Sequence, residues 1–108
     1  MRYLFASLLL VVALPAAQDK QTFTGVISDE MCARDGHARM RMGPTDEECT
    51  RVCVMVHDTA YVLDDGTNVY VLSDQKTPEA FAAQKVRVVG TLDAKTKTIQ
   101  VESITAAR

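Results

Sequence analysis

The sequence predicts a small, mostly β protein: an OB-like, five-stranded β-barrel with one helix inserted after the first strand and a short helix between the third and fourth strands. Three observations support this fold class. Five short segments are rich in β-branched residues, turn residues separate them, and one capping-box pattern opens a clear helix. A mature domain of about ninety residues buries a limited core, so a disulfide or a metal ion would help to stabilise it.

The N-terminal segment has the order of a secretory signal peptide. A basic residue near the start is followed by an apolar run over residues 4–14 and by Pro15, Ala16 and Ala17. This run is too short to span a membrane. We therefore expect a signal peptide over residues 1–17 and an OB-like domain over residues 18–108. We also expect export to the periplasm or the extracellular space, and no stable membrane anchor after cleavage.

The strands are recognised by alternating or β-branched residues between turn signals. Gly25 and Gly90 lie inside two of them and indicate a bulge or a tight bend. Asp64, Asp65 and Gly66 form a strong hairpin turn, which explains both acidic residues without a catalytic role. The expected strands cover residues 21–28, 59–63, 67–73, 85–92 and 97–104.

A helix is expected to begin at Thr45, because Thr45 and Glu48 have the spacing of a capping box. It should continue to about residue 56. At about 100° per residue, one stripe of this helix should face inward and the opposite residues should lie away from it. The inward stripe consists of Cys49, Val52, Cys53 and Val56, and the residues away from it are Glu47, Thr50 and Arg51.

The remaining non-strand segments are a loop and a short helix. Residues 31–43 have no clean period and contain turn signals, so we expect a loop with one short helical turn near residues 38–41. Thr77 and Pro78 are typical of an N-cap and a first helical position, which predicts a short helix over residues 78–83.

All three cysteines and both histidines lie between Met31 and His57, and we interpret this segment as the functional one. Cys49 and Cys53 are one helical turn apart, so both sulfurs should lie on one helix face. Three thiolates and an imidazole suit tetrahedral Zn²⁺, whereas added thioethers favour Cu(I). The candidate ligands are Cys32, His37, Cys49 and Cys53, with Met40 and Met42 as auxiliary ligands, and copper(I) is preferred over zinc.

A disulfide is the competing interpretation, because an exported protein meets an oxidising environment. Cys49 and Cys53 would strain a regular helix if they were bridged, so Cys32 should pair with one of them. Such a bridge closes a ring of about twenty residues and contributes about 3 kcal/mol. One thiol would then be left over. His57 is a weaker candidate ligand than His37, because a histidine after a helix commonly interacts with the helix C-terminus.

Charge and motif content exclude several classes of function. Without Arg2 the chain has eleven basic and fourteen acidic residues, intermixed and without a basic stripe, so nucleic acid is not an expected partner. No catalytic triad, phosphate-binding glycine loop or haem attachment motif is present, and the C-x-x-x-C spacing does not suit thioredoxin-like chemistry. We therefore expect a binding module rather than an enzyme, with a metal ion or an unidentified protein or ligand as partner.

The segments GVISDEMC, CTRVCV and AYVLDDGTNVYVLSDQ, followed by KVRVVGTLD and TIQVESI, resemble a family of small exported bacterial proteins that is classed as a domain of unknown function. The resemblance spans nearly the whole mature chain. It implies a signal peptide, an M-C element, a C-x-x-x-C helix and an OB-like β-region. On this resemblance, the family pattern falls on Met31, Cys32, His37, Cys49 and Cys53. It implies no particular activity.

Overall fold

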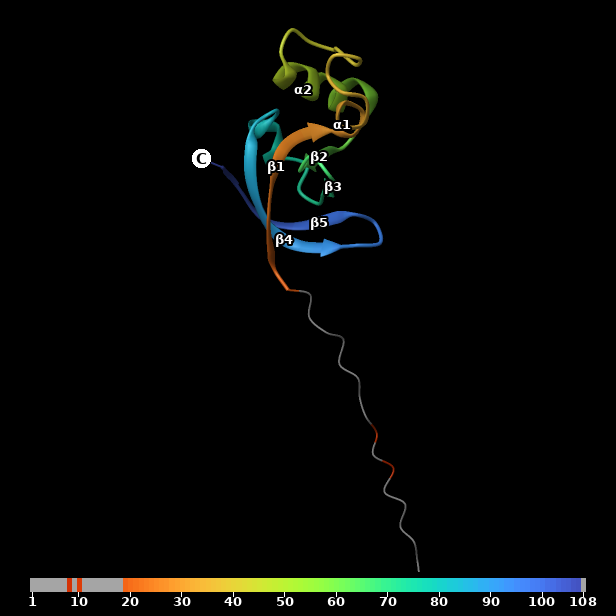
Figure 1. Cartoon of the computed structure of the whole chain (residues 1–108), viewed down its shortest axis with the longest axis vertical. Helices are drawn as coiled ribbons and strands as arrows, with labels where there is room; N and C mark the ends of the chain where they lie inside the picture. The colour runs from red at the N-terminus through yellow and green to blue at the C-terminus, as the bar shows by residue number, and fades with distance from the viewer. Residues whose placement is uncertain (1–7, 9, 11–18, 108) are drawn as a thin grey trace, which may run out of the picture.

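The computed structural model describes residues 8, 10 and 19–107 of the chain. The predicted signal peptide therefore lies outside the described residues, apart from two isolated positions. Strands are the main regular structure of the described chain (Figure 1). The elements in order are β1 (Gln21–Asp29), α1 (Glu30–Asp35), α2 (Asp46–His57), β2 (Tyr61–Asp64), β3 (Val69–Leu72), the 3₁₀ helix η1 (Thr77–Phe81), β4 (Lys85–Asp93) and β5 (Thr98–Ala106).

The five strands form one mixed sheet that closes into a barrel in the order β1-β2-β3-β5-β4. Neighbouring strands are antiparallel except β3 and β5, which run parallel where Val71 pairs with Thr98 and Leu72 with Ile99. The closing contact is the antiparallel pair of β1 with β4. This arrangement confirms the mostly β fold with five strands and a short helix between the third and fourth. Two helices, rather than the one predicted, follow the first strand.

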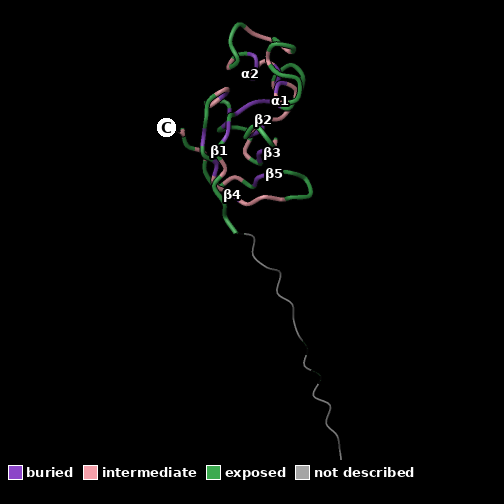
Figure 2. Tube along the Cα trace, in the orientation of Figure 1, coloured by how far each residue is buried: buried purple, intermediate pink, exposed green. Residues whose placement is uncertain are grey.

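The barrel interior holds the apolar core (Figure 2). Successive side chains of a strand point to opposite faces, so Val86 and Val88 on β4 are buried whereas Lys85 and Arg87 are exposed. The fully buried aliphatic residues that meet inside the barrel are Ile27, Leu63, Leu72, Val86, Val88 and Ile99. Alternation therefore places the core correctly on β4, whereas Tyr61, Val62 and Leu63 of β2 are all buried.

The predicted hairpin turn between β2 and β3 is confirmed. The Asp64 carboxylate accepts a hydrogen bond from the backbone N–H of Gly66 at 2.9 Å. The Asp65 carboxylate accepts from Thr67 and Asn68 at 2.8 and 2.6 Å, which lowers its pKa. Both acidic side chains thus stabilise the turn backbone.

The two strand glycines differ in role. At Gly90 the pairing of β4 with β5 shifts register, which confirms the predicted bulge. At Gly25 the pairing with β4 is continuous, so there is no bulge in that ladder. A Cβ atom on Gly25 would lie 2.6 Å from the carbonyl oxygen of Asp64, so glycine is required there because two strands approach closely.

The short helix before β4 begins differently from the prediction. Lys76 occupies the N-cap position of η1, and Thr77 is already helical. The Asp74 carboxylate accepts hydrogen bonds from the backbone N–H groups of Lys76 and Thr77 at 2.9 and 3.0 Å. Asp74 therefore does the capping that the sequence had assigned to Thr77. Among the helices of the described residues, none is long and apolar enough to cross a membrane.

Candidate metal centre

The two α-helices lie together at the end of the barrel where β1 finishes (Figure 1). The first helix, α1, was predicted as loop. It forms because Asp29 caps it: the carboxylate Oδ2 accepts hydrogen bonds from the backbone N–H groups of Met31 and Cys32 at 3.1 and 3.2 Å. Gly36 ends it with φ of 79°, a conformation that favours glycine. The single turn expected near residues 38–41 follows this helix slightly earlier than predicted: the backbone N–H groups of Arg39 and Met40 donate to the carbonyl of Gly36, both at 3.2 Å, and no further helix forms there.

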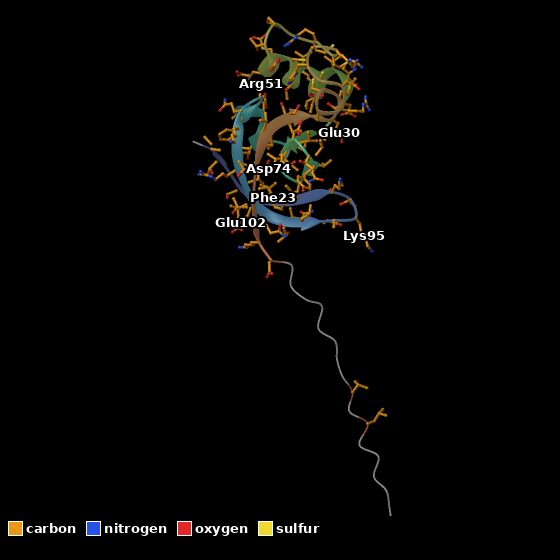
Figure 3. The ribbon with its side chains drawn as sticks, in the orientation of Figure 1. Phe23, Glu30, Arg51, Asp74, Lys95 and Glu102 are labelled. Atoms are coloured by element: carbon orange, nitrogen blue, oxygen red, sulfur yellow. The ribbon has the colours of Figure 1, made fainter. Side chains whose placement is uncertain are left out.

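The second helix, α2, begins where the capping box predicts. Thr45 is the N-cap, and its hydroxyl oxygen accepts a hydrogen bond from the backbone N–H of Glu48 at 3.2 Å. The helix is tied to the barrel through Arg51, which Figure 3 labels at the junction of the two parts. The Arg51 guanidinium donates to the carbonyl of Glu79 in η1 at 3.0 Å and to the carboxylate of Glu47 at 2.6 Å.

The buried side of α2 differs from the predicted stripe. Cys49 and Cys53 are fully buried as expected, but Thr50 is also 0% exposed and Val56 is 62% exposed. The cysteines face Cys32, whereas Val54 packs against the barrel core. The helix therefore packs against both the segment that carries Cys32 and the barrel core. As a result its buried side includes Thr50 and Val54 and excludes Val56.

The three thiols converge around Cys32. Its Sγ atom lies 3.6 Å from Sγ of Cys49 and 3.7 Å from Sγ of Cys53. A disulfide has an S–S length of about 2.05 Å, so neither pair is bridged, and all three cysteines are free and buried. Two thiolates on one tetrahedral zinc ion, each at about 2.3 Å, are about 3.8 Å apart. The observed separations therefore suit two ligands of a common ion.

The loop between the helices encloses Cys49 through its backbone. The Cys49 sulfur accepts a hydrogen bond from the backbone N–H of Met42 at 3.3 Å and contacts the carbonyl oxygen of Met40 at 3.1 Å. The side chains of Met40 and Met42 are half-buried and pack against the cysteine cluster. The structure thus places both predicted auxiliary ligands beside the thiols.

The two histidines lie in different places relative to the cysteine cluster. A ring nitrogen of His37 lies within 4.8 Å of the sulfurs of Cys32 and Cys49, in a group that could hold a metal ion. The Nδ1 atom of His37 is buried and has no hydrogen-bond partner among the described residues. His57 is exposed at the end of α2. The cluster therefore includes His37 and leaves His57 outside.

Asp29 is a member of the cluster that sequence reasoning missed. A carboxylate oxygen of Asp29 and the sulfurs of Cys32 and Cys53 lie within 4.8 Å of one another. Asp29 is 0% exposed. Its position three residues before Cys32, with Gly36 after the helix, is an N-cap and C-cap pattern that could have identified both α1 and this carboxylate.

Burial keeps two of the thiols protonated when no cation is present. Removal from water raises the pKa of Cys32 far above its ordinary value, and the adjacent Asp29 carboxylate raises it further. Burial also raises the pKa of Cys53, an effect that contact with Cys32 partly offsets. A metal ion would reverse this preference by replacing the thiol protons, so its binding should release protons.

Comparison of the chain with models of protein families, with curated proteins and with solved structures gives no significant match. The closed mixed β-barrel bears, at one end, buried cysteine and aspartate side chains and a half-buried histidine, close enough to one another to hold a metal ion.

Proposed function

We propose that this chain is an exported, OB-like binding module whose Cys/His cluster binds a soft transition metal ion. The OB-like assignment is supported by the strand order β1-β2-β3-β5-β4 and by the helix between β3 and β4. The observation that carries the metal proposal is the arrangement of the unbridged, buried thiols. Cys32 lies 3.6 and 3.7 Å from its two neighbours, and His37 adjoins the same group.

Cys32, Cys49, Cys53 and His37 are the proposed ligands. Three thiolates and one imidazole form a set that suits zinc(II), and the two separations measured from the Cys32 sulfur agree with it. The half-buried thioethers of Met40 and Met42 beside the thiols would instead favour copper(I). Because imidazole and carboxylate groups lie in the cluster as well as sulfur, we place zinc(II) before copper(I), the reverse of the order suggested by sequence.

The proposed role is binding or sensing rather than catalysis. The three cysteines are at most 4% exposed, so a substrate would have little access to an ion held among them. A buried site of this kind is typical of an ion that stabilises a fold or is stored and sensed.

Metal uptake by the reduced chain under anaerobic conditions tests this proposal. We expect tight binding of Zn²⁺, and of Cu(I) presented in a chelated form, detected by native mass spectrometry. Cys49→Ser should abolish or greatly weaken it. Met55→Ala is the matched control on the same helix, because Met55 is 76% exposed and lies outside the cluster. Failure of the wild-type chain to take up either ion would contradict the proposal.

The second candidate is a disulfide-stapled structural or interaction domain without metal. The same two distances favour it, because small movements could bring Cys32 into bonding distance of Cys49 or Cys53. Export into an oxidising space would promote the bridge. Thiol counting separates the candidates: protein isolated with one stable bridge and no metal supports the staple, and three free thiols with bound metal support the metal centre.

A further inference from the structure

We infer that the cluster contains two adjacent cation positions that share the sulfur of Cys32, with Asp29 as a ligand of the second. This inference rests on the proposed function and extends it from one ion to a pair. The class of ligand is a pair of divalent, sulfur-seeking cations of the zinc type.

The ligand atoms fall into two groups. One consists of Cys32, His37 and Cys49, and the other of Asp29, Cys32 and Cys53; within each group the ligand atoms lie within 4.8 Å of one another. Cys32 is common to both. A thiolate has several lone pairs and can bridge two ions. At a metal–sulfur distance of about 2.3 Å, two ions on the Cys32 sulfur lie no more than about 4.6 Å apart.

Each group contains one buried polar atom that lacks a hydrogen-bond partner within the described part of the chain. These atoms are Oδ1 of Asp29 and Nδ1 of His37. Oδ2 of Asp29 accepts hydrogen bonds from the backbone N–H groups of α1. The helix cap therefore satisfies this oxygen and leaves Oδ1 without a partner. An unsatisfied buried polar atom is costly, and a cation beside each would remove that cost.

Occupation of both positions has a balanced proton count. When the two ions bind, the S–H bonds of Cys32, Cys49 and Cys53 break, metal–sulfur bonds form, and three protons pass to solvent.

The test is the number of ions bound by the reduced chain. We expect native mass spectrometry to show two Zn²⁺ per wild-type chain, one in Asp29→Asn and one in His37→Asn. Asparagine is a good N-cap, so Asp29→Asn should retain α1, which far-UV circular dichroism checks. Glu30→Gln is the matched control, because Glu30 is the adjacent, exposed carboxylate at the start of α1 (Figure 3), and it should still bind two.

A second measurement does not depend on any variant. Wild-type chain loaded with ¹¹³Cd²⁺ should give two NMR resonances that are coupled to each other through the shared Cys32 sulfur. One resonance and one ion per chain would overturn the two-ion inference and leave the proposed function standing. Two ions retained in Asp29→Asn would overturn the role of Asp29. No ion in the wild-type chain would overturn both proposals.

Discussion

The carboxylate Oδ2 of Asp29 accepts a hydrogen bond from the backbone N–H of Cys32 at 3.2 Å. The last residue of β1 therefore fixes the position of the first cysteine. Because β1 belongs to the barrel, this contact links the cluster directly to the most regular part of the fold. It also makes Asp29 the residue through which helix stability and thiol placement are connected.

Replacing Asp29 by alanine should destabilise the metal-free protein by about 1 kcal/mol, and by up to about 2 kcal/mol, because two helix N–H groups lose their acceptor. Asp29→Asn should lose less, since asparagine also caps. Urea unfolding of the reduced chain measures both. Glu30→Ala serves as the control at the neighbouring exposed position, and equal stability of Asp29→Ala and wild type would contradict the capping role.

The metal-free protein should lose stability as pH rises above the ordinary thiol value of 9.0. The pKa values of Cys32 and Cys53 are raised in the fold, so the unfolded chain releases these protons at lower pH than the folded chain. The free energy of unfolding should therefore keep its full value below the ordinary thiol pKa and fall as the pH rises above it.

Urea unfolding at about pH 8 and about pH 10 measures this decline. Cys53→Ala removes one of the two thiols and should show a smaller loss between the two pH values than the wild type. An equal loss in both proteins would show that Cys53 does not contribute to the pH dependence.

Mild oxidation of the metal-free chain should form one bridge from Cys32, to either Cys49 or Cys53, and leave one thiol free. Cys32 is adjacent to both partners, so the two bridges exclude each other. Intact mass after alkylation and peptide mapping identify the products. Prior loading with Zn²⁺ should slow the reaction. A dominant bridge between Cys49 and Cys53 would require distortion of α2 and would contradict the arrangement described.

Gly25→Ala should destabilise the barrel by about 1–3 kcal/mol, the usual cost of overpacking. The added Cβ would meet the carbonyl oxygen of Asp64 at 2.6 Å, and backbone atoms of paired strands cannot easily move apart. Thermal unfolding measures the effect. Thr24→Ala is the control, because Thr24 is the adjacent exposed residue of the same strand and should change stability little.

The local elements that the sequence predicted correctly are those with a repeating or capped pattern. Alternation identified the strands, and the hydroxyl of Thr45 caps α2 as its spacing with Glu48 predicts. The six-residue helix α1 is too short for a period to be visible, and its only signals were Asp29 and Gly36 at its ends. Gly36 was interpreted as a turn signal and Asp29 was not recognised as an N-cap, so the segment was predicted as a loop.

The sequence predicted that the three cysteines of the candidate site lie together, but it predicted the other residues of the site less well. Cys32, Cys49 and Cys53 meet as expected, because helix phase brings two of them together. Asp29 carried a local signal as the N-cap of α1, but its approach to Cys53 of the other helix is a tertiary contact. The burial of Thr50 likewise depends on how α2 packs against β1, and no spacing within one segment encodes that packing.

Asp29 and Tyr61, the residues on either side of the helical insertion, are paired partners across β1 and β2. The chain thus leaves the sheet and returns to it at one pair of residues on neighbouring strands. In topological terms the two helices are an enlarged hairpin connection, and barrel closure needs none of their residues. We therefore expect that the insertion can change in sequence while the strand pairing is kept, so the proposed cation site and the barrel that carries it can diverge separately.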